Sequence, residues 1–429
     1  IEKAESAFRK FRKTSFEYRA EHMLNCAKIL WENKESYASV ITGEMGKVIK
    51  ESVAEVEKSA WICEYYAQHA EIFLQDEKLD VPDGTSYLVY DPLGIILAVM
   101  PWNFPFYQVF RFAPTAVMAG NVVLLKHASN VPQCGLLIEE IFKKAGFEDG
   151  IFQTLLVRSD KVNKLIDDPG IRAVTITGST EAGMNVAQRA GLNIKKSVLE
   201  LGGSDPFIIL KDADINTAAD IAAKARMINC GQSCIAAKRF IIEEEIYDEF
   251  ILRFQKNLHQ LKFGDPLDET SDYASMASQK LKEILDVQVK KSLESGANIL
   301  WSDNQAPNEG AFYNPTIITD IKPGMPAHEE ELFGPAASVF KVKSAREAIE
   351  QANNSDFGLG ASIWSRNIDR VKNIARDIES GVVYINGLVA SRPEIPFGGI
   401  KKSGFGRELA HLGIREFVNQ KTIFINKNS

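Results

Sequence analysis

The stretch GIILAVM at residues 94–100 decides the fold of this 429-residue chain. It is apolar throughout and has the length of a strand. A second run of the same kind, NVVLLK, follows at residues 121–126. Strands without polar alternation are typical of parallel sheets, because helices cover both faces of such sheets. We therefore expect an α/β fold whose ligands bind at the carboxyl ends of strands.

The alternation of strands and helices continues along most of the chain. Residues 1–75 are predicted to be helical, because apolar residues recur three and four positions apart. Further strands are expected at 151–157, 173–177, 206–210, 239–243, 315–319, 336–341, 360–364 and 382–385. Helices are expected between them at about 105–119, 132–146, 160–167, 180–190 and 215–229, and up to about 261. Asp214 is suited to cap the helix at 215–229. A chain of this length exceeds one core, so we expect two or three domains.

Three segments depart from this alternation. Residues 79–90 contain an Asp-Gly turn between two short strand-like runs, which indicates a hairpin. The tail carries TIFI at 422–425, a run suited to pairing with another sheet edge. Residues 264–312 are rich in Gly, Asp, Asn and Ser, and we expect them to form a surface excursion.

Composition excludes several classes of function. Hydrophobic residues make up 45% and charged residues 25% of the chain, as in ordinary soluble proteins. The net charge of -7 argues against a nucleic-acid binder. We find neither a membrane-spanning apolar run nor a signal segment, so no membrane partner is expected. The five scattered cysteines favour a reducing cytoplasm, and no Cys/His cluster completes a metal site.

Cys234, in the run GQSCI at 231–235, is the candidate nucleophile. A thiolate attacks carbonyl carbon, whereas a neutral thiol does so poorly. Glu200, at the start of ELGG, is the candidate base, able to take a proton from the thiol or from a hydrolytic water. The neighbouring glycines allow backbone amides to approach an oxyanion. The alternative is a buried structural cysteine and an unrelated glutamate.

Two loops that follow strands suggest further binding groups. Asn103 lies between two prolines in PWNFP at 101–105, where its amide can donate to an oxyanion; the alternative is a turn-forming residue. The run TGSTEAG at 177–183 ends a strand and opens a helix, which can present amides to a phosphate. Its spacing is not the dinucleotide fingerprint G-x-G-x-x-G, and a tight turn is the alternative.

Two side-chain motifs are weaker. Lys126 ends a strand, within reach of ribose hydroxyls or a phosphate, although a lysine there is usually solvated. ELFGP at 331–335 places the carboxylate of Glu331 two residues before the ring of Phe333, a pair suited to a ribose and a flat ring. The alternative is a charged loop.

Together these stretches resemble the aldehyde dehydrogenase superfamily over nearly the whole chain and in the same order. The matching segments are 101–105, Lys126, 178–183, 200–203, 231–234, 331–333 and PFGGIKKSG at 396–404. Within the superfamily, the runs around 126–128, 200–206, 232–239 and 401–408 are most similar to bacterial succinate-semialdehyde dehydrogenases that accept NAD or NADP.

The resemblance implies a role for each catalytic residue. Cys234 would form a thiohemiacetal with the aldehyde, and Asn103 and the backbone N–H of Cys234 would hold its oxyanion. Hydride transfer to the nicotinamide would leave a thioester, and Glu200 would activate the water that hydrolyses it to a carboxylic acid.

The resemblance also implies the cofactor contacts. Lys126 and Glu331 would hold ribose hydroxyls. Phe333, Trp102, Gly178 and Ser179 would contact the nicotinamide side and the pyrophosphate. Many NAD-preferring relatives carry Glu where this chain has Ser129. Because serine does not repel a 2′-phosphate, we expect NAD or NADP as cofactor.

The substrate side of the resemblance is less complete. Arg111 matches an arginine that binds the distal carboxylate of succinate semialdehyde, with Phe397 as a further substrate contact. Arg111 as a structural helix residue is the alternative. A second arginine of those relatives is replaced here by Ile228, and Arg226 is out of phase by two. Succinate semialdehyde is therefore the leading substrate. The rivals are a general small-aldehyde dehydrogenase, a CoA-acylating one, a non-redox thioesterase and a non-catalytic protein.

The implied architecture has two doubly wound α/β domains and a small β element. Residues 1–73 and 93–201 would form the cofactor-binding domain, and residues 202–406 the domain with the nucleophilic cysteine. Residues 74–92 and 407–429 would form an oligomerisation element, so a homodimer or homotetramer is expected. Relatives usually have more residues before the first helix, which is consistent with a truncated start at Ile1.

Overall fold

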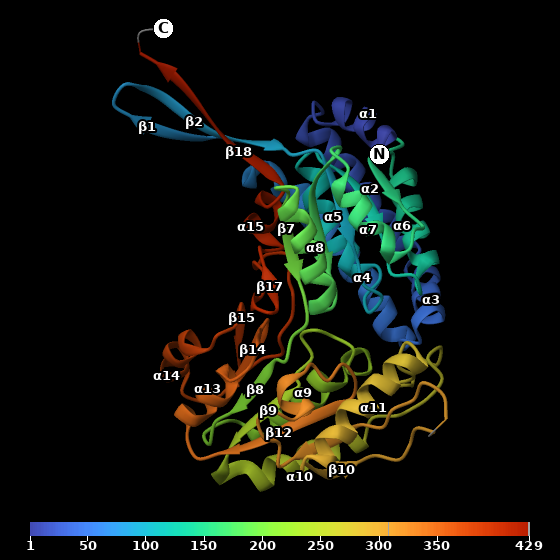
Figure 1. The fold of residues 1–429 in the computed structure, drawn as a ribbon, viewed down its shortest axis with the longest axis vertical. Helices are drawn as coiled ribbons and strands as arrows, with labels where there is room; N and C mark the ends of the chain where they lie inside the picture. Colours follow the sequence, from blue (N-terminus) through green and yellow to red (C-terminus); the bar gives the residue numbers. More distant parts are fainter. Residues whose placement is uncertain (308, 428–429) are drawn as a thin grey trace.

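The computed structural model describes residues 1–307 and 309–427 and has two α/β lobes and a projecting arm (Figure 1). The first lobe contains a six-stranded sheet in the order β17-β7-β6-β3-β4-β5. These strands are β3 (Ile95–Val99), β4 (Val122–Lys126), β5 (Phe152–Thr154), β6 (Ile171–Thr177), β7 (Lys196–Glu200) and β17 (Gly404–Phe405). All pairs are parallel except β17 with β7, so the predicted parallel α/β sheet is confirmed.

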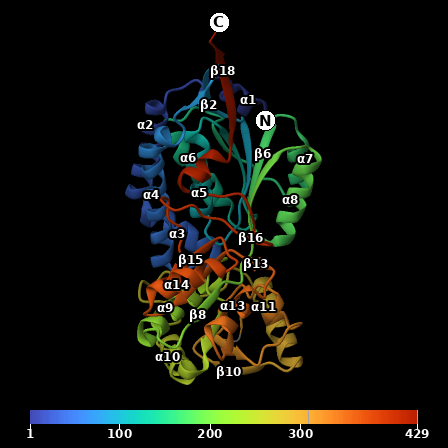
Figure 2. The same ribbon diagram turned by 90° about the vertical axis from the view of Figure 1, so that its left-hand side faces the viewer.

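Helices cover both faces of this first sheet (Figure 2). They are α1 (Glu2–Phe11), α2 (Phe16–Glu32), α3 (Lys34–Met45), α4 (Ile49–Phe73), α5 (Tyr107–Met118), α6 (Pro132–Lys144), α7 (Val162–Asp167) and α8 (Thr180–Leu192). Residues Ile96, Leu97 and Ala98 of β3 are fully buried, as expected for a strand between two helical layers.

The second lobe is built on a seven-stranded sheet in the order β10-β11-β12-β9-β8-β14-β15. Its strands are β8 (Pro206–Ile209), β9 (Arg239–Glu243), β10 (Asn298–Ser302), β11 (Thr316–Thr319), β12 (Ala336–Val342), β14 (Gly360–Trp364) and β15 (Val382–Ile385). Its helices are α9 (Ile215–Met227), α10 (Tyr247–His259), α11 (Gln279–Glu294), α12 (Pro326–Glu329), α13 (Ala345–Asn353) and α14 (Ile368–Ile374). Asp214 caps α9 as predicted, accepting from the backbone N–H of Thr217.

The predicted surface excursion at 264–312 is wrong in part. It contains the sixteen-residue helix α11 and the edge strand β10, which pairs antiparallel with β11. Only Leu285, Val289 and Ser292 of α11 are buried, so the helix is polar on most of its surface. Its composition therefore resembles that of a loop, which explains the wrong prediction. The strand predicted at 151–157 is also shorter, because only β5 pairs within it.

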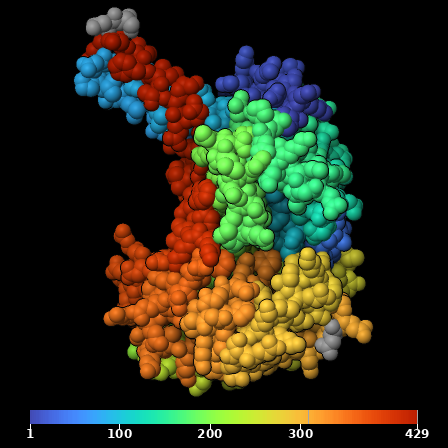
Figure 3. All heavy atoms as spheres, viewed as in Figure 1, coloured from blue at the N-terminus to red at the C-terminus, as the bar shows by residue number. Residues whose placement is uncertain are grey.

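The arm is a three-stranded antiparallel sheet that projects from the first lobe (Figures 1 and 3). It consists of β1 (Glu77–Val81), β2 (Gly84–Pro92) and β18 (Val418–Asn426), and α15 (Ala410–Arg415) leads into it. The TIFI run pairs with β2 of the same chain. The two-residue strands β13 (Phe357–Gly358) and β16 (Ile400–Lys401) pair near the junction of the lobes.

The carboxyl ends of the first sheet point toward the second lobe (Figure 1). The loops after β3, β6 and β7 therefore meet the loop after α9, which belongs to the second lobe. Among the described residues, no helix has both the length and the apolar character needed to cross a bilayer.

Candidate active site

Cys234 follows a short, tightly turned segment after α9. Asn229, Cys230 and Gly231 all have φ in the left-handed region, at 50°, 53° and 74°. A Cβ at Gly231 would lie 2.3 Å from the carbonyl oxygen of Gly334, so only glycine fits there. The turn places Cys234 in a partly buried position, whereas the other four cysteines are buried.

Side chains from the first lobe hold this turn in place. The backbone N–H of Asn229 donates to both carboxylate oxygens of Glu51 on α4, at 3.0 and 3.1 Å. The Asn229 side chain donates 2.8 Å to the carbonyl of Asn103. Left-handed conformations in residues other than glycine cost free energy, and these bonds offset that cost. The cysteine loop is therefore fixed against the loop that carries Asn103.

Asn103 is buried and offers one free donor. Its Nδ2 donates to the carbonyl of Gln232 at 3.1 Å, two residues before Cys234. An amide nitrogen has two N–H groups, so the second is left for a substrate oxygen near the thiol.

Glu200, at the end of β7, is almost fully buried, and neither of its oxygens accepts a hydrogen bond of ordinary geometry from the described residues. Burial raises the pKa of this carboxyl above its usual range, and the nearby Arg111 opposes that rise. Burial likewise raises the pKa of the Cys234 thiol to about 12, against the lowering effect of Arg111 and Lys238. The thiol is thus neutral at rest, with a carboxyl group of elevated basicity close enough to influence it.

Arg111 lies between two carboxylates inside the site. Its Nε forms an ion pair with Glu408, and its Nη2 lies 3.8 Å from Glu200 and donates to Thr177 at 3.4 Å. The guanidinium also lies over the ring of Phe397, 5.0 Å from its centroid. Phe397 is buried and exchanges two backbone hydrogen bonds with Glu408, so it contacts the ion pair and does not line the cavity beside the thiol.

Two cavities meet at Cys234. The first, of about 240 Å³, is lined by Trp102, Asn103, Gly178, Ser179, Glu331 and Phe333, among others. Trp102 and Phe333 are edge-to-face at 5.8 Å between ring centroids. Ser179 caps α8 by accepting from Ala182, so the amide-rich start of this thirteen-residue helix faces the cavity. The motifs from residues 101, 178 and 331 are thus brought together.

Lys126 and Ser129 lie farther along the same edge of the sheet. Lys126 ends β4, pairs in register with Val99, and donates 3.3 Å to the hydroxyl of Ser159. Ser129 is exposed in the loop that follows β4. Neither residue lines the 240 Å³ cavity.

The second cavity, of about 190 Å³, lies on the other side of the thiol. It is lined by Glu51, Glu55, Lys58, Phe104, Tyr107, Gln108, Arg111, Ile228, Ser391 and others. Arg226 is absent from it, because its guanidinium is buried and donates to the carbonyls of Gly231 and Ala336.

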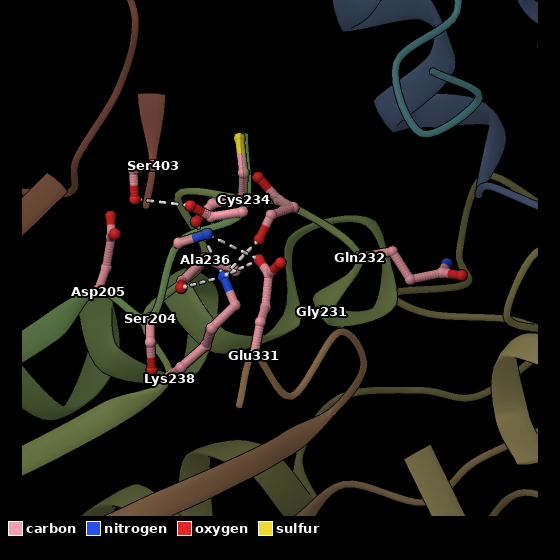
Figure 4. A network of polar contacts seen from close by, with 12 residues as sticks. Ser204, Asp205, Gly231, Gln232, Cys234, Ala236, Lys238, Glu331 and Ser403 are labelled. Atoms are coloured by element: carbon pink, nitrogen blue, oxygen red, sulfur yellow. Dashed lines mark hydrogen bonds and ion pairs between the residues drawn. The ribbon is translucent and has the colours of Figure 1, made fainter. Parts of the chain in front are cut away.

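A buried lysine connects the cysteine loop to Glu331 (Figure 4). Lys238 Nζ donates to the carbonyls of Ser233 and Cys234 at 2.8 Å and of Ala236 at 3.2 Å. The same ammonium pairs with Glu331 at 3.2 Å, and Glu331 accepts from the backbone N–H of Gly203 at 3.1 Å. Figure 4 shows the sulfur of Cys234 on the opposite side of the loop.

Sequence reasoning missed Lys238, Glu51 and Asn229. Of these three, only Lys238 could have been recognised from the sequence. It lies four residues after Cys234 and just before a buried strand, where an ammonium must find acceptors in the preceding loop. Within residues 1–307 and 309–427 there is no cluster of three His, Cys, Asp or Glu side chains that suits a metal ion.

Comparison with known proteins places this geometry in one family. Residues 1–423 match the model described as aldehyde dehydrogenase family. The probable succinate-semialdehyde dehydrogenase [NADP(+)] of Synechocystis sp. is 48% identical over 425 residues, covering 99% of this chain and 94% of the relative. Succinate-semialdehyde dehydrogenase [NADP(+)] 1 of Mycobacterium tuberculosis is 46% identical over 428 residues, with 99% and 94% covered.

Solved structures agree with the sequence comparison. The crystal structure of succinic semialdehyde dehydrogenase from Streptococcus pyogenes, in complex with NADP+, superposes with a TM-score of 0.97 at 39% identity. The superposition covers 99% of this chain and 94% of that chain.

Proposed function

Because the chain belongs to the aldehyde dehydrogenase family, we propose that it oxidises succinate semialdehyde to succinate with NADP, and more slowly with NAD. The observation that carries the proposal is the position of Cys234 at the meeting point of two cavities, one for each reactant. The relatives named as NADP-dependent succinate-semialdehyde dehydrogenases support the choice of substrate and cofactor.

The residues of the first cavity, together with Lys126 outside it, suit a dinucleotide. A Cβ at Gly202 would lie 2.5 Å from Glu331 Oε2, so glycine there lets this carboxylate reach the cavity. The start of α8 suits a pyrophosphate, Glu331 and Lys126 suit ribose hydroxyls, and Trp102 and Phe333 give an apolar wall. Ser129 carries no charge that would repel a 2′-phosphate. When bound, the nicotinamide supplies a hydride acceptor beside the thiol.

The chain's own residues carry out the remaining chemistry. Cys234 gives up its proton as Sγ attacks the aldehyde carbon, and Glu200 is the base available to take it. Asn103 Nδ2 and the backbone N–H of Cys234 stabilise the resulting oxyanion. After hydride loss the carbon is held as a thioester. Glu200 releases the thiol proton to solvent and then removes a proton from the attacking water; the C–S bond breaks to release the acid, and this second proton returns to the sulfur of Cys234.

The arm and the cysteines support two further parts of the proposal. The arm projects beyond the lobes, and Ile423, Phe424 and Ile425 of β18 are about half exposed, as expected of a surface that joins a second copy. This exposed apolar surface supports our proposal that the enzyme is a homodimer or homotetramer. The five free cysteines suit a cytoplasmic location.

The test is the near-ultraviolet absorbance of reduced nicotinamide during turnover. Purified enzyme is supplied with succinate semialdehyde, glutarate semialdehyde, butanal, hexanal or benzaldehyde, each with NAD and with NADP. The proposal requires the highest kcat/KM with succinate semialdehyde and NADP. Equal turnover of butanal would mean that the enzyme is a general aldehyde dehydrogenase without selectivity for a carboxylated substrate. A requirement for CoA would contradict the role of Glu200 as the hydrolytic base.

A further inference from the structure

The cavity on the aldehyde side contains a second nucleophilic group besides the thiol. Lys58 lies on α4 and lines the same 190 Å³ cavity as Cys234. Its Nζ donates to the hydroxyl of Ser391 at 3.3 Å and lies 4.3 Å from the centre of the Tyr107 ring. These contacts hold the amine at the wall of the cavity that an aldehyde must enter.

Lys58 forms no ion pair with a carboxylate of the described residues. Glu55, one turn earlier on the same helix, pairs with Lys47. Glu51, the other acid that lines the cavity, accepts the backbone N–H of Asn229 through both oxygens. An ammonium without a paired anion gives up its proton more readily than a paired one.

The electrostatic surroundings favour the neutral amine. Burial and the positive charge of Arg111 lower the pKa of Lys58 to about 8; Glu55 opposes this change and Arg392 adds to it. An exposed lysine, with a pKa of about 10.4, is almost wholly protonated where Lys58 is about half neutral. Desolvation beside another cation is a general way of activating a lysine for attack on a carbonyl carbon.

Two hydroxyl groups beside Nζ suit the proton transfers of imine formation. Tyr107 Oη and Ser391 Oγ are 2.6 Å apart, and Ser391 Oγ also accepts from Lys58. Burial raises the pKa of Tyr107 above its usual range, so its hydroxyl stays protonated. This pair can therefore donate a proton to an oxygen that leaves as water.

We propose that Lys58 captures aldehydes as a reversible imine, a second covalent site that competes with Cys234 for the aldehyde. Nζ attacks the carbonyl carbon to form a C–N bond, and a proton passes from nitrogen to oxygen to give a carbinolamine. The C–O bond then breaks and the oxygen leaves as water. No oxidant is consumed, and addition of water restores the amine and the aldehyde. Because capture needs only an aldehyde group, it does not depend on succinate semialdehyde being the substrate.

The experiment traps the imine by reduction. Enzyme without cofactor is incubated near pH 8 with butanal or with succinate semialdehyde, each with sodium cyanoborohydride, which converts an imine into a stable secondary amine. Peptide mass spectrometry then locates the modified lysines. Lys58 should be labelled at least about tenfold more than Lys50, an exposed lysine of the same helix that pairs with Asp272. Labelling of Lys58 no higher than that of Lys50 would overturn the inference.

Residual activity gives a second readout. After desalting, the trapped enzyme should have lost dehydrogenase activity in proportion to the labelling of Lys58, because the attached group projects into the cavity. Lys58→Arg keeps the positive charge but cannot form an imine, so the treatment should leave its activity unchanged. Lys50→Arg is the matched control and should be inactivated like the wild type. Equal inactivation of Lys58→Arg and the wild type would contradict capture at Lys58.

The pH dependence of labelling in the wild type covers the case in which Lys58→Arg fails to fold. The rate of labelling at Lys58 should rise as the pH increases through about 8, since the neutral amine is the attacking form. The titratable and charged groups that face Lys58 are Glu51, Glu55, Tyr107, Arg111, Cys234 and Arg392. A rate that stays constant across that pH range would overturn the inference.

The outcomes separate this inference from the proposed function. An enzyme that prefers succinate semialdehyde and NADP but is not labelled at Lys58 would overturn only the inference. An enzyme that is labelled at Lys58 and oxidises butanal equally well would support the inference and exclude the proposed substrate selectivity.

Discussion

Cys234 is the residue on which the proposed chemistry depends. Its thiol is neutral at rest, so turnover requires that its proton be removed during attack. Cys234→Ala should abolish dehydrogenase activity with every aldehyde, because the other four cysteines are buried. Cofactor binding, measured by quenching of tryptophan fluorescence, should persist. Activity within tenfold of the wild type would remove Cys234 from the mechanism.

The raised pKa of Glu200 predicts a pH dependence. A carboxyl whose pKa lies above its usual range is protonated, and useless as a base, at pH values where a free glutamate is ionised. The steady-state rate should therefore rise with pH beyond the ordinary range of carboxyl titration. Glu200→Gln should lower the steady-state rate at least about a hundredfold.

A pre-steady-state measurement isolates the step in which Glu200 acts. Because the proposed mechanism assigns both proton transfers to Glu200, Glu200→Gln should slow the first burst of reduced cofactor as well as the steady-state rate. A burst of full amplitude at the wild-type rate would show that Glu200 acts only in thioester hydrolysis, and a normal steady-state rate would exclude it as the base.

Lys238 couples the cysteine loop to a carboxylate of the cofactor cavity, and we expect it to act as a positioning residue. Lys238→Met leaves the carbonyls of Ser233 and Cys234 without their buried donor and Glu331 without its cation. The KM for the cofactor should rise about tenfold and kcat should fall. In a double-mutant cycle with Glu331→Gln the two effects should not add. Simple additivity would show that the two residues act separately.

At the scale of elements, helix α4 holds the active-site loops. Glu55 binds the first backbone N–H groups of the segment leading into α5, and its partner Lys47 lies 3.8 Å from the ring centre of Phe104. Glu55→Gln leaves Lys47 as a fully buried, unpaired cation, so the free energy of unfolding should fall by about 3 to 5 kcal/mol. Urea denaturation measures this change. The double variant Lys47→Met with Glu55→Gln should recover part of the loss; no recovery would mean that the hydrogen bonds to the loop dominate.

Elements were predictable from sequence where the hydrophobic pattern was strong. The strands β3, β4 and β6 carry continuous apolar runs and were predicted at nearly their observed bounds. Strand β7 was not predicted, because Lys196 and Glu200 bound a short run whose burial comes from its neighbours. Helix α11 was missed because it buries only three residues.

The same distinction holds for the site. Motifs such as 101–105 and 231–234 could be recognised as candidate site segments from the sequence alone, and the structure brings them together. The ion pair of Arg111 with Glu408 joins residues that are separated in sequence by the whole second lobe, and Lys58 contacts Tyr107 and Ser391 from two other segments. No local pattern encodes such contacts, so they appear only when the chain is folded.

At the scale of the molecule, the site exists because the two lobes meet at the carboxyl edge of the first sheet. The loop with Cys234 comes from the second lobe, whereas Asn103, Glu200 and α8 come from the first. After the second lobe, the chain comes back to the first sheet and adds to this contact. Strand β17 pairs with β7, and Gly404 of β17 lies in register with Glu200. The lobes are therefore held together where the base is placed.

The arm gives the prediction that belongs to the whole molecule. Ile423 and Ile425 occupy alternate positions of β18, so their side chains share one face, and both are about half exposed. If that face joins a second copy, replacing both with aspartate should bury two uncompensated charges and yield monomers, seen by light scattering on a sizing column. Gln420→Asp with Thr422→Asp adds the same charge to the neighbouring alternate positions and is the matched control. Because the lobes contain all the proposed catalytic residues, the monomer should retain its circular dichroism spectrum. An oligomer unaffected by the two isoleucine changes would exclude this face of the arm as the interface.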